Sequence, residues 1–306
     1  MNFSNGVQNK VIFVMGSTGT GKTKLSVSLA THFPAQIINA DKIQVYKGLD
    51  IITNKISDDE TLGVPHHLLG FVDPDEDFTA EEFCQHTLLA IARIIQKGCV
   101  PIIVGGSNNY IKALVEDPTI QFRQKFDCCF LWMDVSLPVL YEYVGKRVDK
   151  MVELGLVEEV REMFHPKADY TRGVRRAIGA PEMHKYLEIE GHEMIDEAAK
   201  KMLLDAAIKE IKENTCKLVN NQLEKIQRLR DELGWEIHRI DATNVLKHSG
   251  KEAEEAWEIA VMKPSLEIVG EFFKEKGLVV SSTFKPCSPA GEGIGDDAEK
   301  SISSMV

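Results

Sequence analysis

Residues 11–23 read VIFVMGSTGTGKT and combine two patterns. The first five form a short apolar run, which is typical of a strand buried in a parallel sheet. The next eight match G-x-x-x-x-G-K-[ST], and the apolar residues behind them, Leu25, Val27, Leu29 and Ala30, indicate a helix. A strand, a glycine loop and a helix in this order are the setting that a phosphate-binding loop requires.

The glycine loop predicts a site for a polyphosphate. Glycines let the backbone curl so that successive amide groups point at one anion, and the helix N-terminus adds positive potential. Lys22 adds a full charge, and Thr23 is the expected ligand of a magnesium ion. The binding residues expected from the loop are Gly16, Ser17, Thr18, Gly19, Thr20, Gly21, Lys22 and Thr23. The loop leaves the ligand open, because ATPases, kinases and diphosphate-handling transferases all present a similar anion.

Further apolar runs at residues 36–40, 100–104, 130–135 and 236–240 predict the fold class. Helical periodicity lies between most of these runs, and parallel strands need crossover connections of this kind. We therefore predict an α/β fold with a P-loop NTPase-like, doubly wound parallel sheet and a smaller helical lobe. Ligands of such sheets bind at the carboxyl ends of the strands, where the glycine loop lies.

The same patterns divide the chain. Residues 8–136 are predicted to be the first part of the α/β core. Residues 137–230 show apolar spacings of three and four and are predicted to be mainly helical, with an acceptor-side lobe beginning near a break at 165–173. Residues 231–262 would add the final strand and helix of the core, and the Ser-, Pro- and Gly-rich residues 281–306 are predicted to be a disordered tail.

Composition narrows the classes of partner. The formal net charge of −11 repels phosphate backbones, so a tRNA partner is disfavoured unless a local basic patch exists. The six cysteines include no C-x-x-C pair, so we expect neither a zinc site nor a disulfide framework. An apolar run of about 18 residues is absent, so no membrane span is expected, and the chain as given leaves no room for a signal segment before its first strand.

An acid follows the second predicted strand. Asp41 should face the ligand, where its carboxylate could orient an attacking amine or hydroxyl and accept the proton; the alternative is that it caps the following turn. A motor or switch NTPase also needs an acid after a later strand to hold magnesium. Residues 102–104 are followed by Gly105-Gly106-Ser107, and Asp134 lies inside a strand pattern, which weakens ATP hydrolysis as the main activity.

Four motifs in one order resemble the isopentenyltransferase family. They are the glycine loop, NADKIQVYKGLDI at residues 39–51, PHHLL at 65–69 and VGGSNNY at 104–110. The family includes tRNA dimethylallyltransferases and the adenylate isopentenyltransferases that begin cytokinin biosynthesis in plants. The sequence is most similar to the plant adenylate branch, and the resemblance spans roughly residues 10–235.

The resemblance implies roles for particular residues. The matching positions are Asp41 for the general base, Thr18, Lys22 and Arg147 for the leaving diphosphate, Ser107 for the hydroxyl after the Gly-Gly pair, and Thr53 for contact with the acceptor adenine. Without the resemblance, Arg147 would be interpreted as a solvated helix residue, and His66 and His67 as loop or core histidines.

The resemblance also implies a reaction. The prenyl group of dimethylallyl diphosphate would move to N6 of AMP, ADP or ATP, with Mg²⁺ on Thr23 helping to stabilise the diphosphate. One alternative is a tRNA dimethylallyltransferase that modifies an anticodon-loop adenosine. A second is a P-loop small-metabolite kinase with ATP in the glycine loop and Asp41 as its base.

The densest basic cluster is Arg172, Arg175 and Arg176, and we expect some of these to bind the acceptor's phosphates. The alternative is a solvated helix end paired with Glu182 or Glu188. We also expect a monomer without a membrane partner, located in the plastid, with its transit segment absent from this chain, or in the cytoplasm.

A helix around residues 209–223 resembles a family segment that is often more basic in tRNA enzymes. Its neutral Asn220 and Asn221 favour a small acceptor.

Overall fold

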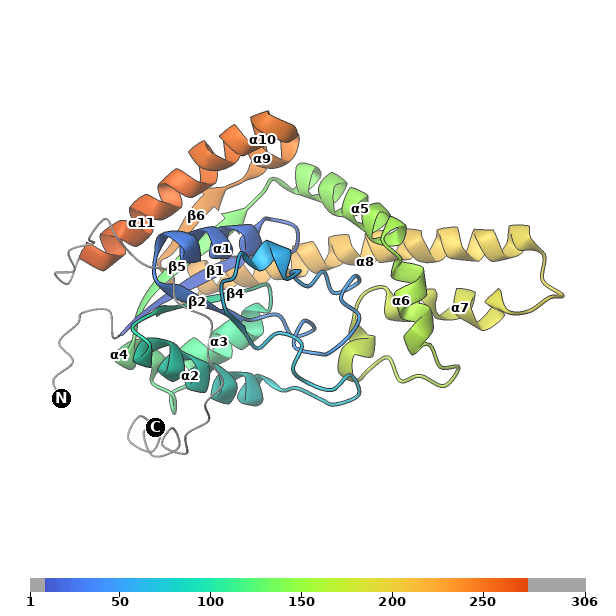
Figure 1. The fold of residues 1–306 in the computed structure, drawn as a ribbon, viewed down its shortest axis with the longest axis horizontal. Coiled ribbons are helices and arrows are strands. Elements are labelled where there is room, and N and C mark those ends of the chain that lie inside the picture. Colours follow the sequence, from blue (N-terminus) through green and yellow to red (C-terminus); the bar gives the residue numbers. More distant parts are fainter. Residues whose placement is uncertain (1–8, 275–306) are drawn as a thin grey trace.

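A computed structural model describes residues 9–274, and six parallel strands form one sheet in the order β3-β2-β4-β1-β5-β6 (Figure 1). The strands are β1 (Lys10–Gly16), β2 (Ala35–Asn39), β3 (His66–His67), β4 (Val100–Gly105), β5 (Asp127–Asp134) and β6 (Ile237–Asp241). All five predicted strands are present, with ends shifted by at most three residues, and the predicted parallel α/β sheet is confirmed. The two-residue strand β3 was not predicted, because it is too short to carry a pattern.

Helices connect the strands. They are α1 (Lys22–His32), α2 (Ala80–Gln96), α3 (Asn108–Glu116), α4 (Phe122–Lys125), α5 (Leu137–Glu153), α6 (Leu156–Met163), α7 (Ala180–Glu190), α8 (Glu197–Asp231), α9 (Thr243–Lys247), α10 (Gly250–Trp257) and α11 (Lys263–Lys274). Short 3₁₀ turns occur at Asp59–Thr61 and Gly173–Arg176, and a π-helical turn, Glu258–Met262, joins α10 to α11.

The sheet separates two apolar cores. Val11, Phe13 and Met15 of β1 point to one face, where they join residues of α2, α3 and the C-terminal part of α8. Ile12 and Val14 point to the other face and pack with residues of α1 and α11. Successive side chains of a strand alternate between faces, so a strand covered on both sides is apolar throughout.

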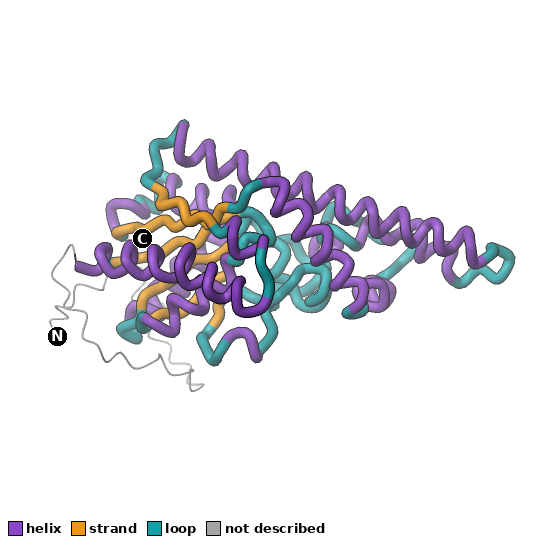
Figure 2. Tube along the Cα trace, turned by 90° about the horizontal axis from the view of Figure 1, so that it is seen from above, coloured by secondary structure: helices purple, strands orange, loops and turns teal. Residues whose placement is uncertain are grey.

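The helix α8 is 35 residues long and runs from the region of α6 and α7 to the sheet (Figure 1). Its buried residues recur at intervals of three and four, namely Ala207, Ile211, Thr215, Val219, Gln222, Ile226 and Leu229, so one face is covered along most of its length. In Figure 1 its N-terminal half lies with α5, α6 and α7, away from the sheet. Figure 2 shows the strands at one end and helices extending toward the other.

The predicted division of the chain can be compared with these elements. All regular structure between β5 and β6 is helical, from Leu137 to Asp231, in agreement with the pattern of residues 137–230. The exact domain boundaries stay a prediction. Residue 8 and the predicted tail at 281–306 lie outside the described residues.

Asp134 corrects one expectation. It is the last residue of β5 rather than an internal one, and its Oδ2 accepts a hydrogen bond from Arg239 Nε of β6 at 2.7 Å. The strand ends there because the chain turns away through Ser136, the residue before α5. The carboxylate is therefore directed at the edge strand.

Candidate active site

The glycine loop joins β1 to α1 at the carboxyl end of the sheet and is closely surrounded. A Cβ atom on Gly16 would lie 2.5 Å from the carbonyl oxygen of Met133, and one on Gly19 would lie 2.8 Å from Val144 Cγ1 of α5. Gly16, Gly19 and Gly21 also have positive φ angles of 152°, 85° and 90°. Only glycine accepts both conditions, so the sequence pattern has a direct steric cause.

Two cationic side chains converge on this loop. Lys22 Nζ donates to the carbonyl oxygen of Ser17 at 2.7 Å, and Arg147 Nη2 of α5 donates to Thr18 Oγ1 at 2.8 Å. The Nε of Arg147 is buried and has no hydrogen-bond partner among the described residues. A buried, unpaired cationic donor is costly, so this geometry favours an anion as the missing partner.

Burial makes this pair of cations unusual. It lowers the pKa of Lys22 to about 8; the nearby Asp41 carboxylate opposes this shift, and Arg147 adds to it. Burial also lowers the pKa of Arg147 from its ordinary value. A bound diphosphate would relieve the repulsion between the two cations.

The remaining hydroxyls of the loop have different surroundings. Thr20 Oγ1 donates to Ser17 O at 2.9 Å, and Ser17 Oγ donates to Val219 O of α8 at 3.0 Å, so both side chains stabilise the loop itself. Thr23 is exposed in the first turn of α1, and its hydroxyl has no hydrogen bond within residues 9–274. It is accessible to a cation that a phosphate brings with it.

Asp41 lies two residues after β2. Its Oδ1 accepts a hydrogen bond from Ile43 N at 2.9 Å, so the carboxylate does close a turn, as the alternative interpretation expected. Its Oδ2 has no hydrogen bond in the described part of the chain. One oxygen can therefore hold the turn while the other receives a proton.

Ser107 fixes the turn that carries Asp41. Its Oγ accepts from Lys42 N at 2.9 Å, and its own N donates to Ala40 O at 3.2 Å. The two residues before Ser107 must be glycines, because other segments pack directly against their Cα atoms. A Cβ on Gly105 would overlap Ala40 O, and one on Gly106 would overlap the side chain of Gln222. The Gly-Gly-Ser motif thus packs the end of β4 against the turn that carries Asp41.

Gln222 of α8 is a further residue of this region, and the sequence did not single it out. Its Oε1 accepts from Thr18 N at 2.7 Å, and its Nε2 donates to Gly106 O at 3.1 Å. Glutamine in an amphipathic helix carries no distinctive pattern, so only the tertiary structure could find it.

Thr53 is held within its own loop. Its Oγ1 donates to Leu49 O at 2.7 Å, and its carbonyl oxygen accepts from Gln44 Nε2 at 3.0 Å. Glu159 of α6, a second residue that the sequence did not single out, accepts from Ile51 N and Ile52 N at 2.8 and 2.9 Å. A role for Thr53 at the acceptor adenine stays a prediction.

The arginine cluster divides into two parts. Arg172 pairs with Asp77 at 3.1 Å and Arg175 pairs with Asp75, so the expected alternative partners Glu182 and Glu188 were wrong. Both arginines lie in or beside the 3₁₀ turn before α7, which directs them at the loop before α2 instead of along α7. They line a cavity of about 290 Å³ with Asp75, His165, Lys167, Ala168 and Asp169.

Arg176 has other surroundings. Its Nη2 donates to the Tyr46 hydroxyl at 2.8 Å and its Nε donates to Gly173 O at 3.1 Å. Burial lowers the pKa of Lys42, nearby Arg176 and Lys225 lower it further, and Asp41 opposes them. Arg176 therefore belongs to the electrostatic neighbourhood of Asp41.

The described residues offer no preformed metal cage. Within residues 9–274 no group of three His, Cys, Asp or Glu side chains could hold a metal ion. His67 bonds to Gln36 Oε1 at 2.9 Å, and burial, with Lys97, Arg93 and His66 nearby, lowers its pKa to about 4. Magnesium often keeps several waters and binds through one or two protein groups plus substrate phosphates, so a single exposed hydroxyl at Thr23 fits it.

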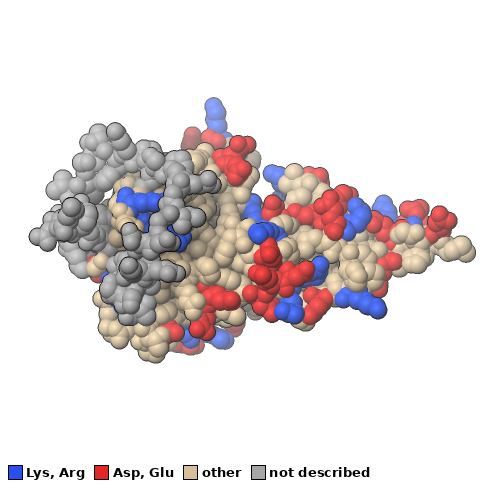
Figure 3. All heavy atoms as spheres, turned by 60° about the horizontal axis from the view of Figure 1, so that its bottom comes forward, with Lys and Arg blue, Asp and Glu red and all other residues tan. Residues whose placement is uncertain are grey.

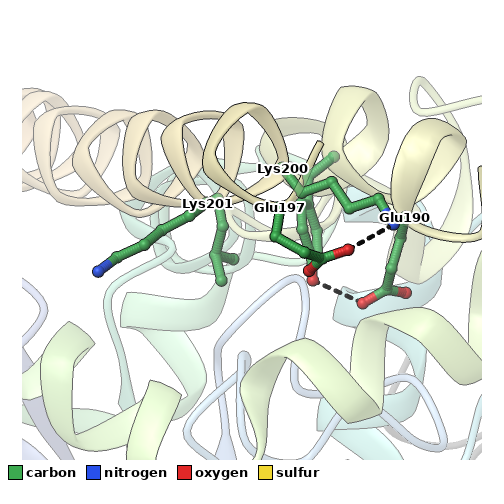
Figure 4. A pocket seen from close by; sticks show the side chains of 6 residues that line it. Glu190, Glu197, Lys200 and Lys201 are labelled. Carbon is green, nitrogen blue, oxygen red and sulfur yellow. Dashed lines mark hydrogen bonds and ion pairs between the residues drawn. The ribbon is translucent and has the colours of Figure 1, made fainter. Parts of the chain in front are cut away.

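A larger cavity of about 350 Å³ lies between α7 and α8 (Figure 4), and its lining includes no residue of the glycine loop. Of its charged groups, Glu197 pairs with Lys200 at 2.9 Å, and Glu190 pairs with Arg161 and accepts from the Tyr186 hydroxyl, while Lys201 is drawn in Figure 4 without such a contact. In Figure 3, away from the residues drawn in grey, Lys and Arg side chains lie among Asp and Glu. In the described part of the chain, no helix has the length and apolar character needed to cross a bilayer.

Known proteins match this sequence and this fold. The model of the family described as IPP transferase matches residues 44–125 and 117–228. Adenylate isopentenyltransferase 5, chloroplastic, of Arabidopsis thaliana is 55% identical, with 87% of this chain and 80% of that protein covered. Adenylate isopentenyltransferase 7, mitochondrial, of the same plant is 49% identical, with 94% of this chain and 88% of that protein covered.

A solved structure shares the fold. A eukaryotic dimethylallyltransferase acting on tRNA matches with a TM-score of 0.73 at 24% identity, over 92% of this chain and 82% of that one. The family match and the identity of the plant relatives agree with the strand, loop and helix order described above. The chain belongs to the IPP transferase family of prenyltransferases, and its relatives at 49–55% identity are adenylate isopentenyltransferases.

Proposed function

We propose that this chain transfers the prenyl group of dimethylallyl diphosphate to N6 of an adenine nucleotide, AMP, ADP or ATP, which is the first step of cytokinin biosynthesis. The observation that carries the proposal is the convergence of Lys22 and Arg147 on the glycine loop, beside the carboxylate of Asp41. The adenylate isopentenyltransferases among the relatives support the choice of acceptor.

The loop and the two cations would act on the donor. The exocyclic amine of adenine is a weak nucleophile because its lone pair is delocalised into the ring, so the barrier must be lowered mainly at the leaving group. Loop amides, Lys22 and Arg147 would stabilise the charge that accumulates on diphosphate as the allylic C–O bond breaks. Arg147 Nε, which has no hydrogen-bond partner among residues 9–274, would donate to a diphosphate oxygen.

Magnesium would be held by Thr23 Oγ1 together with diphosphate oxygens and water. When bound, it would supply positive charge beside the leaving group.

Asp41 would act on the acceptor. Its Oδ1 keeps the turn closed, while Oδ2 would accept a hydrogen bond from the amine and then its proton. Ser107 would position Asp41 by holding Lys42 N. Because the carboxylate also lies near Lys22, base and leaving-group site belong to one site, in which the amine and the leaving oxygen can lie on opposite sides of the allylic carbon.

Among the three arginines, Arg176 is the one we assign to the acceptor's phosphates. Its position near Lys42 and Asp41 supports this choice, whereas Arg172 and Arg175 are paired with Asp77 and Asp75. Thr53 would contact the adenine from the loop that Glu159 anchors.

A labelled donor tests the function. Dimethylallyl diphosphate carrying a labelled prenyl group is incubated separately with AMP, ADP, ATP and unmodified tRNA. We expect rapid label transfer to at least one free nucleotide and little to tRNA. Transfer to tRNA alone would identify the tRNA-modifying alternative. Phosphoryl transfer from ATP without prenyl diphosphate, combined with no prenyl transfer, would identify a kinase.

We further propose that the protein is a monomer and acts in the plastid or the cytoplasm. The chloroplastic relative at 55% identity supports the plastid, and the mitochondrial relative at 49% makes that organelle the competing result. Light scattering on the purified chain and imaging of a fluorescent fusion in plant cells test these two statements.

A further inference from the structure

We propose that Gln222 of α8 is a positioning residue that sets the distance between the loop that holds the donor and the loop that carries the base. This inference rests on the function proposed above. It adds a residue that touches neither substrate but acts through two backbone groups.

The first contact of Gln222 is with the donor loop. Its Oε1 accepts from Thr18 N at 2.7 Å, at the residue whose hydroxyl also receives Arg147. One helical turn earlier, the carbonyl oxygen of Val219 accepts from Ser17 Oγ at 3.0 Å. Two successive turns of α8 therefore hold the glycine loop.

The second contact is with the Gly-Gly loop after β4. Gln222 Nε2 donates to Gly106 O at 3.1 Å. The backbone carbonyl oxygen of Gln222 accepts from Asn108 Nδ2 at 3.1 Å. The residue between them, Ser107, holds Lys42 N next to Asp41 at 2.9 Å. One amide group thus connects the loop of Thr18 to the turn of the base.

The connection is tight because the amide is enclosed. Gln222 is 8% exposed, and its two amide atoms are both used, one by each loop. A Cβ on Gly106 would overlap its Nε2, so the spacing leaves room for hydrogen only at that position. A buried amide whose donor and acceptor face different segments fixes their separation more closely than apolar packing does.

This separation matters for the reaction. Direct displacement needs the amine, the allylic carbon and the leaving oxygen in line, and an error of about 1 Å can cost about 10²-fold in rate. Loss of the Gln222 bridge should therefore lower kcat more than it weakens binding of the donor, because in the proposed function Lys22 and Arg147, not Gln222, bind the diphosphate.

Substitutions of Gln222 test this directly. Gln222→Met keeps the length but removes both hydrogen bonds, and Gln222→Asn keeps the amide but is too short to reach both loops. We expect each to lower kcat about 10²-fold, with the KM for the donor changed less than about threefold. Gln227→Met, an exposed change on the same helix, is the matched control and should leave kcat within about twofold of the parent.

A change on the other side of the contact tests the bridge while Gln222 is kept. Gly106→Ala should displace the amide and lower kcat similarly. Combined with Gln222→Ala, which makes room, it should cause little further loss, because coupled residues are not additive. Additive losses in kcat would contradict the proposed contact.

Hydrogen exchange without substrate separates this inference from the function. In Gln222→Met, peptides covering residues 16–21 and 41–44 should exchange faster than in the parent, and in Gln227→Met they should not. A wild-type chain without prenyl transfer would refute the function alone, because exchange tests the bridge independently. The bridge would be refuted if exchange of these peptides in Gln222→Met equalled that of the parent. It would also be refuted if the Gln222 variants, assayed at a temperature where they are folded, had the kcat of the parent.

Discussion

The glycine loop and the segment 172–176 are both rich in features that suggest an anion site, yet the structure treats them differently. In the loop region Lys22 and Arg147 are half-buried and donate to a backbone oxygen and a hydroxyl oxygen, and Arg147 Nε is buried without a hydrogen-bond partner in the described part of the chain. In the other segment Arg172 and Arg175 reach the carboxylates of Asp77 and Asp75, although Arg175 Nε, like Arg147 Nε, is buried and has no hydrogen-bond partner within residues 9–274. The difference is therefore the acid: a carboxylate balances the charge of Arg172 and of Arg175, whereas Arg147 donates to the neutral hydroxyl of Thr18, so its charge favours an anionic ligand.

The comparison also shows that charged residues in a sequence are not equally good indicators of an anion site. Three arginines within five residues formed the more conspicuous cluster, while Arg147 stood alone on a helix. Distant acids neutralised two members of the cluster, and burial made the isolated arginine significant. Density of charge along the chain is therefore a weaker indicator than unpaired, buried charge.

The largest effect is expected at Asp41, whose charge acts on both Lys22 and Lys42. Asp41→Ala should lower kcat by about 10² to 10⁴-fold, the usual range for losing a general base, with donor affinity largely kept. Asp41→Asn is the matched variant, because its amide oxygen can still accept from Ile43 N but cannot take the proton. Steady-state kinetics with donor-binding measurements check both. Full activity of Asp41→Asn would reduce Asp41 to a turn residue.

Arg147 tests the loop side of the comparison. Arg147→Met removes the donor to Thr18 and the unpaired Nε, and should lower kcat about 10² to 10³-fold, as expected for one lost stabiliser of developing charge. Arg175→Met makes the same chemical change in the paired segment and should stay within about twofold. Single-turnover rates at saturating substrates measure both, and similar losses would remove the distinction between the two regions.

The pH dependence of donor capture should report Lys22. Its amine is cationic below a pKa of about 8 and loses its charge as pH rises through that value, so kcat/KM for the donor should fall above about pH 8. For a single group the fall approaches about tenfold per pH unit. In Lys22→Arg the charge persists, so activity is lower overall but this fall should be absent. A pH profile that is the same in both proteins would contradict the assignment.

The smallest effects separate the arginines from one another. Arg176→Met should raise the KM for the acceptor nucleotide about tenfold, because one charge-assisted contact to a phosphate is lost. Arg172→Met, whose partner is the exposed Asp77, should change it less than about twofold. Initial rates measured against nucleotide concentration give the KM of each variant. Equal changes in KM would contradict the assignment of Arg176, and not Arg172, to the acceptor's phosphates.

Much of the fold was predictable because its causes are local. Because an apolar core covers each face of the sheet, β1 must be apolar on both faces. This requirement produces the continuous apolar run at residues 11–15. The glycine loop was predictable because positive φ angles and close neighbours exclude other residues at Gly16 and Gly19. Asp134 was placed wrongly because an apolar run does not mark where a strand stops pairing.

The sequence by itself determined the parallel sheet, the glycine loop and the acid that follows the second strand, since each depends on residues close together in the chain. Only the tertiary structure decided which polar groups meet: Arg147 with Thr18 across 129 residues, Arg172 with Asp77 across 95, and Gln222 with Thr18 across 204. The physical reason is that local patterns fix backbone shape, whereas the partner of a buried donor is chosen by packing between segments that the chain brings together only when it folds.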